Sequence, residues 1–137
     1  MQDLEKALGI LDQQYVHYQT MYQVSLEQRN FIEGEDLSRL DASFERMHRL
    51  MDQIRLHQAG MPDLGENGMQ LELHERRAKL RDIITELDEL RQVNERSVKQ
   101  LLERTRVELR QFGQGRRAIR KYQNSQVQGA RFFDGRR

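Results

Sequence analysis

The sequence predicts an all-α protein, an elongated antiparallel three-helix bundle or coiled coil with a long third helix and a flexible C-terminal tail. Apolar side chains recur at steps of three and four residues along three segments, at about 3–32, 37–57 and 70–112. A third of the 137 residues are charged and Trp is absent, which is typical of extended helices rather than of sheet proteins. The third segment contains neither Pro nor Gly, so we expect one helix of about 65 Å.

Length and composition limit the class of protein further. The chain is long enough for one domain with a modest core, and we expect a helical domain over 1–113 followed by a flexible basic tail over 114–137. The absence of Cys excludes disulfides, thiol nucleophiles and thiolate metal sites. No apolar run approaches the ~20 residues of a membrane span, and no signal-peptide core is present. We therefore expect a soluble cytoplasmic protein without stable membrane insertion.

The first helix, 3–32, has an apolar seam with a heptad spacing that includes three tyrosines. Tyrosine rings can be buried while each hydroxyl reaches a partner or water, so a helix–helix seam is favoured over a dedicated ligand site. Ser25 and Arg29 occupy the next seam positions, and the apolar stripe weakens toward the helix end. The seam residues are Leu4, Leu8, Leu11, Tyr15, Tyr18 and Tyr22.

Gly34 and Asp36 separate the first helix from the second. Gly34 suits a C-terminal cap and Asp36 suits an N-cap, so a tight turn is favoured over a collinear kink. The segment 58–68 contains the only Pro and three glycines, which is typical of a loop between antiparallel helices. The seam of the second helix, 37–57, consists of Leu37, Leu40, Phe44, Met47, Met51 and Ile54.

The third helix has more apolar surface than two shorter helices are expected to cover. In an up-down-up arrangement it overhangs the second helix by about half its length. An apolar face without an intramolecular partner is normally a binding surface for another helix. Within this stripe, Asn94 is better explained as a register-setting polar group than as a direct contact to a partner. The far part of the stripe consists of Val98, Leu101, Leu102, Leu109 and Phe112.

The charge is distributed unevenly along the chain. Residues 1–112 contain 21 acidic and 16 basic side chains, a net charge of −5, whereas residues 113–137 have a net charge of +6. The four histidines are scattered, and a single Glu45-x-x-His48 pair lacks the second copy that a di-iron bundle needs. We therefore expect no enzyme activity, no metal and no cofactor.

Three stretches form a recognisable series, namely residues 26–32 with Asp36-Leu37, residues 87–102, and Tyr122 with residues 129–136. Together they resemble the flagellar export chaperone FlgN family. Residues 26–32, followed by Asp36-Leu37, are similar to that family's Glu-Arg-x-x-Ile segment before its second helix. Residues 87–102 resemble its Leu/Asn/Leu-Leu stretch in the long third helix. Tyr122 and residues 129–136 are similar to its tyrosine-then-glycine tail that ends on an apolar–Asp–basic sequence.

This resemblance implies a cytoplasmic chaperone of flagellar type III export. Members of the family bind the hook–filament junction proteins FlgK and FlgL, prevent their premature assembly and deliver them to the export gate and its ATPase apparatus. The implied client-binding residues are Val98, Leu101, Leu102, Leu109 and Phe112, and the implied export-gate contact is Tyr122. We expect a monomer or weak dimer that binds no nucleic acid.

Two alternatives from other classes stay open. The basic tail, with Arg116-Arg117, Tyr122 and Phe132-Phe133, could bind a nucleic acid by charge and stacking. The net negative charge of residues 1–112 disfavours nucleic-acid binding, because it repels phosphates. Alternatively, the spare apolar stripe closes a structural coiled-coil homodimer.

Overall fold

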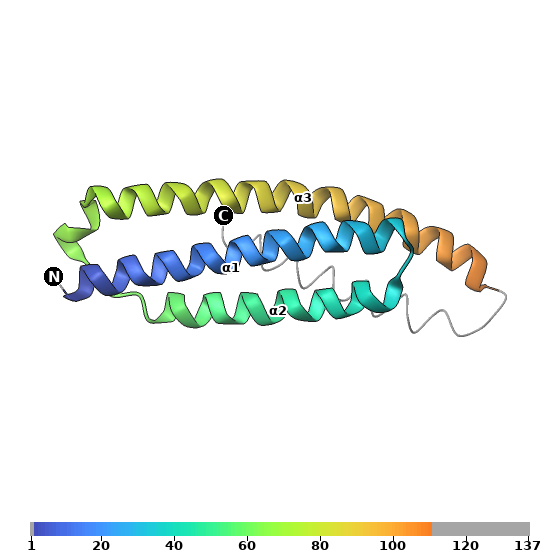
Figure 1. Ribbon diagram of the computed structural model, residues 1–137, viewed down its shortest axis with the longest axis horizontal. Coiled ribbons are helices and arrows are strands. Elements are labelled where there is room, and N and C mark those ends of the chain that lie inside the picture. Colours follow the sequence, from blue (N-terminus) through green and yellow to red (C-terminus); the bar gives the residue numbers. More distant parts are fainter. Residues whose placement is uncertain (1, 111–137) are drawn as a thin grey trace.

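The computed structural model describes residues 2–110, which form three α-helices and one short 3-10 helix (Figure 1). The helices are α1 (Gln2–Glu33), α2 (Leu37–Ala59) and α3 (Leu71–Leu109), and the 3-10 helix η1 (Gly65–Met69) precedes α3. Neighbours in sequence run antiparallel, so α1 and α3 point the same way (Figure 1). The predicted all-α bundle is confirmed, with each described helix end within three residues of its expected position. Residues 111–137, including the predicted tail, lie outside the described residues.

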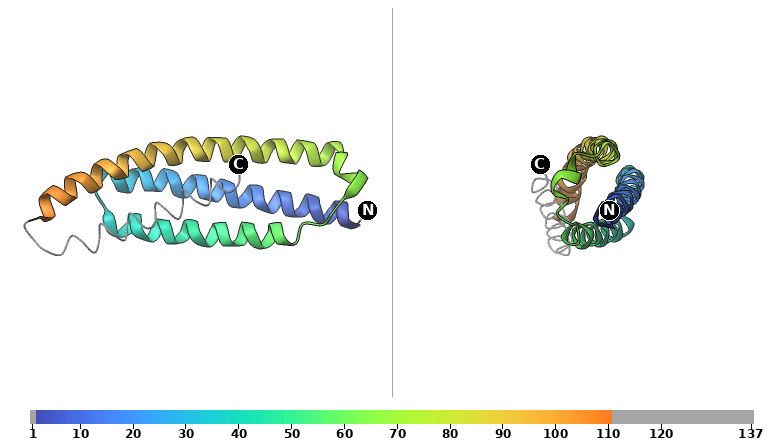
Figure 2. Two further views of the ribbon diagram at one scale, coloured as in Figure 1. Left: turned by 180° about the vertical axis from the view of Figure 1, so that it is seen from behind. Right: turned by 90° about the vertical axis from the view of Figure 1, so that its left-hand side faces the viewer.

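The helix α1 lies between the other two. It packs along both α2 and α3, whereas the backbones of α2 and α3 approach each other at few positions (Figure 2). A helix with two neighbours must bury a broad face, and the buried apolar residues of α1 cover more than one heptad row. They are Ala7, Ile10, Leu11, Tyr18, Met21, Val24 and Ile32.

The tyrosine seam of α1 belongs to this packing. Tyr18 is buried, and Tyr15 and Tyr22 are half-buried against the same core, which confirms the helix–helix interpretation. The Lys79 ammonium lies 4.7 Å from the centroid of the Tyr15 ring, a cation–π geometry between α3 and α1. The predicted apolar seam of α1 nevertheless lies slightly to one side of the centre of its buried face. Leu4 and Leu8 are half-buried, whereas Ala7 is buried, because the middle of the buried face lies between α2 and α3.

Two apolar clusters fill the bundle. The main cluster lies along α1, the second half of α2 and the first half of α3. Its buried members are Ala7, Leu11, Tyr18, Met21, Val24, Met47, Met51, Ile54, Leu73, Leu80, Ile83 and Leu87. The far cluster lies where α1 turns into α2. It consists of buried Ile32, Leu40, Val98, Leu101 and Leu102, with Phe31, Leu37 and Phe44 packed against it.

The turn between α1 and α2 is the tight turn that the sequence favours. The Asp36 amide donates to the Phe31 carbonyl (2.8 Å) and the Glu35 amide donates to the Ile32 carbonyl (3.1 Å), the two hydrogen bonds of a Schellman cap. The left-handed residue is Glu35, with φ 54°, and not the glycine beside it. The Asp36 side chain then caps α2 by accepting from the Arg39 amide at 3.2 Å.

The loop between α2 and α3 covers the other end of the bundle. Met61 and Leu64 pack against the main cluster there, where α2 has already ended at Ala59. Gly65 starts the 3-10 helix with φ 53°, a conformation that favours glycine, and its amide donates to the Asp63 carboxylate at 3.2 Å. Among the described residues, no helix is sufficiently long and apolar to span a membrane.

The turn geometry predicts that Glu35→Gly stabilises the protein. A non-glycine residue in the left-handed region costs about 1 kcal/mol, and the exposed Glu35–Arg104 ion pair that the change removes contributes less. We expect the free energy of unfolding, measured by urea titration, to rise by about 0.5–1 kcal/mol, since the greater unfolded-state freedom of glycine offsets part of the gain.

Gly34→Ala is the matched control for this change. Gly34 has no positive φ, so its replacement relieves no strain. The reduced unfolded-state freedom is opposed by the added Cβ, 3.4 Å from the Asn30 carbonyl, so we expect a smaller change than for Glu35→Gly. An equal response to both substitutions would contradict the assignment of the strain to Glu35.

Candidate partner-binding site

Three of the five predicted client-binding residues are buried inside the molecule. Val98 and Leu101 are each 2% exposed and Leu102 is 7% exposed, all within the far cluster. The expectation that they form an open apolar stripe is therefore wrong. Leu109 is the last residue of α3, and its side chain, Phe112 and Tyr122 all lie outside what the structure describes.

The direction of the chain explains this burial. The expectation compared the lengths of α2 and α3, but α2 begins at the far end of the bundle, immediately after α1 has reached it (Figure 1). The first turns of α2, through Leu37, Leu40 and Phe44, therefore cover α3 where a gap was expected. The helix α2 is shorter than α3 at the opposite end of the bundle. There the loop residues Met61 and Leu64 cover the main cluster in its place.

Only the last turns of α3 project beyond the other two helices, as the orange end of the ribbon shows (Figure 1). Arg104 pairs with Glu35 of the α1–α2 turn at 3.5 Å, so this pair marks the end of the bundle. Beyond it, Val107 is 59% exposed. The projecting residues 105–109 span about 7 Å of helix, far less than half of α3.

A buried polar layer separates the far cluster from the main cluster. It consists of Ser25, Gln28 and Asn94 at the seam between α1 and α3. The Asn94 amide donates to the Ser25 carbonyl at 2.8 Å, which ties the two helices in register as the sequence suggests. The Asn94 Oδ1 and Ser25 Oγ atoms are buried without a hydrogen-bond partner among the described residues. Each such atom costs about 1–3 kcal/mol unless water reaches it.

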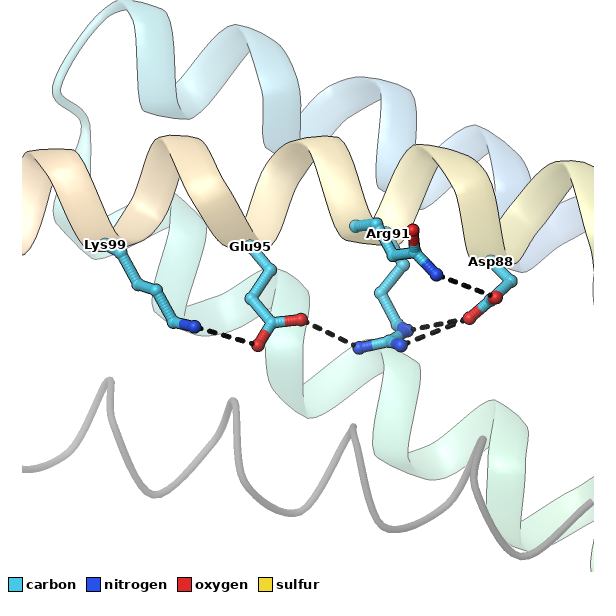
Figure 3. A network of polar contacts seen from close by, with 5 residues as sticks. Asp88, Arg91, Glu95 and Lys99 are labelled. Carbon is cyan, nitrogen blue, oxygen red and sulfur yellow. Dashed lines mark hydrogen bonds and ion pairs between the residues drawn. The ribbon is translucent and has the colours of Figure 1, made fainter.

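A charged network lies beside this layer, on the α3 face turned toward α2 (Figure 3). Arg91 donates to the Asp88 and Glu95 carboxylates, each at 3.1 Å, and Lys99 pairs with Glu95 at 3.5 Å. The Gln92 amide also donates to Asp88 at 3.1 Å. The Asp88 and Arg91 side chains are largely buried, so this ion pair is shielded from water more than the other ion pairs of the bundle.

Two histidines stack near the other end, between α1 and α2. The ring centroids of His17 and His57 are 5.3 Å apart, with 25° between the ring planes. Burial lowers the pKa of His17, and the neighbouring His57 lowers it further, because both disfavour the charged form. Among residues 2–110, no group of three or more His, Asp or Glu side chains is placed to hold a metal ion.

The polar layer could have been anticipated only in part. Asn94 stands out in the sequence because it interrupts an apolar stripe, and Ser25 because it interrupts a seam. Gln28 was missed, although Met21 and Gln28 lie seven residues apart on one buried row of α1. The sequence feature that indicates burial of Gln28 is a second heptad row on α1. This row is informative only once α1 is known to have two neighbouring helices.

The histidine pair predicts a pH dependence of stability. The folded protein binds a proton at His17 less tightly than the unfolded chain, so the contribution of this group is present above about pH 6.5. It is lost as the pH falls through the lowered pKa. We expect the Tm of His17→Gln, measured by circular dichroism, to fall less between pH 7 and pH 5 than that of the unsubstituted protein.

His74→Gln is the control for this experiment, because His74 is exposed on α3. Its Tm should follow that of the unsubstituted protein over the same pH range. If His17→Gln and His74→Gln behave alike, the His17–His57 stack does not affect stability.

Comparison with known proteins identifies no family for this chain. The chain matches no protein-family model, no curated protein and no solved structure.

Proposed function

We propose that this protein is a flagellar type III export chaperone that binds a helical segment of the hook–filament junction proteins FlgK and FlgL. It keeps the client unassembled and delivers it to the export gate. The proposal combines the motif resemblance with one structural observation, the projection of α3 beyond the bundle after Arg104 (Figure 1). A projecting helical end is accessible to a partner helix for a first contact while the bundle is closed.

The register of α3 identifies the face of this projection. Leu109 follows Leu102 by seven residues in one helix, so both positions lie on the same side as the far cluster. Val107 lies two residues before Leu109, about 200° around the helix, and is exposed. The stripe that continues from the far cluster therefore passes through position 109 and not through position 107.

The buried state of Val98, Leu101 and Leu102 also bears on the homodimer alternative. That alternative needs a spare apolar stripe on the folded bundle, and these three residues are already covered by α1 and α2. The stripe thus offers no reason to expect a homodimer in the closed bundle. The proposed client contact starts instead at the projecting end of α3.

We predict that Leu109→Asp weakens binding of purified FlgK or FlgL at least tenfold, as measured by isothermal titration calorimetry. A carboxylate placed on the docking face would have to lose its water against an apolar client surface. Leu102→Asp is unsuitable for this test, because Leu102 is buried and the change would unfold the far cluster.

Val107→Asp is the matched control, since it adds the same charge two residues away on the other side of α3. It should bind the junction protein like the unsubstituted chain, and both variants should keep the helical circular dichroism signal. Equal loss in the two variants would refute the assigned face. If the unsubstituted chain binds neither FlgK nor FlgL, the chaperone proposal itself is wrong.

A further inference from the structure

The projecting end of α3 is too small to hold a partner by itself. A stable protein interface involves about 20–30 residues on each side and buries about 1,200 Å² or more in total. Residues 105–109 provide only one turn and a half of helix. If α3 carries the binding site, part of the surface must come from residues that are covered in the closed bundle.

We infer that the far cluster opens as a separate unit and exposes Val98, Leu101 and Leu102 to an acidic amphipathic helix of the partner. This inference deepens the proposed function, because it names the surface and the chemistry of the partner segment. The unit that moves is the α1–α2 corner, with Phe31, Leu37 and Phe44, which packs on α3 in the closed state.

The buried polar layer is the boundary of this unit. Along α1 and α3, Ser25, Gln28 and Asn94 lie between the buried apolar residues of the far cluster and those of the main cluster, which form two separate groups. Because Asn94 Oδ1 and Ser25 Oγ have no hydrogen-bond partner among the described residues, opening lets water reach two atoms that the closed state leaves unsatisfied. Segments bounded in this way open below the free energy of global unfolding.

The corner itself is held weakly. Its turn places Glu35 in the left-handed region, which favours glycine, and its ion pair to Arg104 joins two largely exposed side chains. The far cluster has five buried apolar residues, whereas the main cluster has twelve. The corner is therefore the part of the described bundle that separates from α3 most easily.

Opening creates a stripe of useful length. Val98, Leu101 and Leu102 join position 109 in one helical register, and residues 98–109 span about 18 Å, which is more than three turns. A partner helix with apolar residues at steps of three, four and seven matches this stripe.

Charge selects the kind of partner. Around the stripe, residues 96–110 carry five basic and two acidic side chains, all exposed, so the flanks are positive. A partner helix with an acidic polar face is attracted there, whereas residues 113–137, with a net charge of +6, are repelled. The same segment of a second copy, residues 96–110, is repelled for the same reason, so pairing of two copies through this segment is disfavoured. We therefore assign the stripe to an acidic helix of another protein.

Native-state hydrogen exchange of the full chain tests the opening. Amides of 37–44 and 98–104 should exchange faster than those of 73–87, through an opening smaller than global unfolding. Asn94→Leu joins the two clusters with an apolar side chain and should slow exchange in the far segments at least tenfold. Ser25→Ala, which removes one unsatisfied hydroxyl without adding volume, should shift exchange in the same direction by less.

Gly9→Ala is the control, because Gly9 lies inside α1 with nothing within 4 Å of an added Cβ. It should slow only the amides that exchange by global unfolding. Equal protection of the amides of 37–44, 98–104 and 73–87, or an equal effect of Asn94→Leu and Gly9→Ala on the far segments, would overturn the separate opening.

Two designed 18-residue helices test the partner chemistry, each with Leu at the a and d positions and either Glu or Lys elsewhere. The Glu peptide should bind the chain in fluorescence anisotropy, more weakly at 0.5 M salt, and at least tenfold more weakly to Asn94→Leu. Equal binding of both peptides, or of neither, would refute the proposed surface. Because no junction protein is used here, failure of this test and failure of the chaperone proposal are distinguishable.

Discussion

The structure depends on the packing of α1 against α3, which run side by side in the same direction along most of α3. A helix of 39 residues has no stable fold as an isolated amphipathic rod, and the 32 residues of α1 cover most of its apolar face. The helix α2 also packs along α1, and its side chains join those of α1 and α3 in both apolar clusters. The bundle therefore has one central helix and two clusters, and not one uniform core.

Much of this arrangement follows from local patterns. Asp36 caps α2 as its side-chain chemistry dictates, and Gly34 is followed by a Schellman turn. The single Pro and the glycines between residues 58 and 68 mark the second turn, although α2 continues to Ala59. Such features are encoded within a few residues of chain, so periodicity and capping rules predict them.

The features that could not be predicted depend on how the helices are placed in space. A comparison of helix lengths does not show which end of the long helix the shorter helix leaves uncovered. The position of that uncovered end determines whether Val98, Leu101 and Leu102 are exposed. The left-handed conformation at Glu35 likewise depends on which residue follows the last helical turn, and the glycine one position earlier was the stronger expectation. The buried row through Gln28 becomes recognisable only once α1 is seen to have two neighbours.

In the proposed function, the burial of Val98, Leu101 and Leu102 and the polar layer beside them act together. A chaperone that presented Val98, Leu101 and Leu102 permanently would expose an aggregation-prone surface. A chaperone that covers them with a loosely held corner keeps the surface closed until a partner helix competes for it. The layer of Ser25, Gln28 and Asn94 provides that separation at the α1–α3 seam.

Thiol labelling tests this central claim most directly, because the natural chain contains no cysteine. Single cysteines replace Leu101 in the far cluster, Leu87 in the main cluster and Val107 on the projecting end, and a thiol reagent reports their accessibility. The account predicts that Val107→Cys reacts at once, Leu101→Cys through a measurable opening, and Leu87→Cys only on global unfolding. If Leu101→Cys reacts as slowly as Leu87→Cys, or as fast as Val107→Cys, the far cluster is not a separately opening unit.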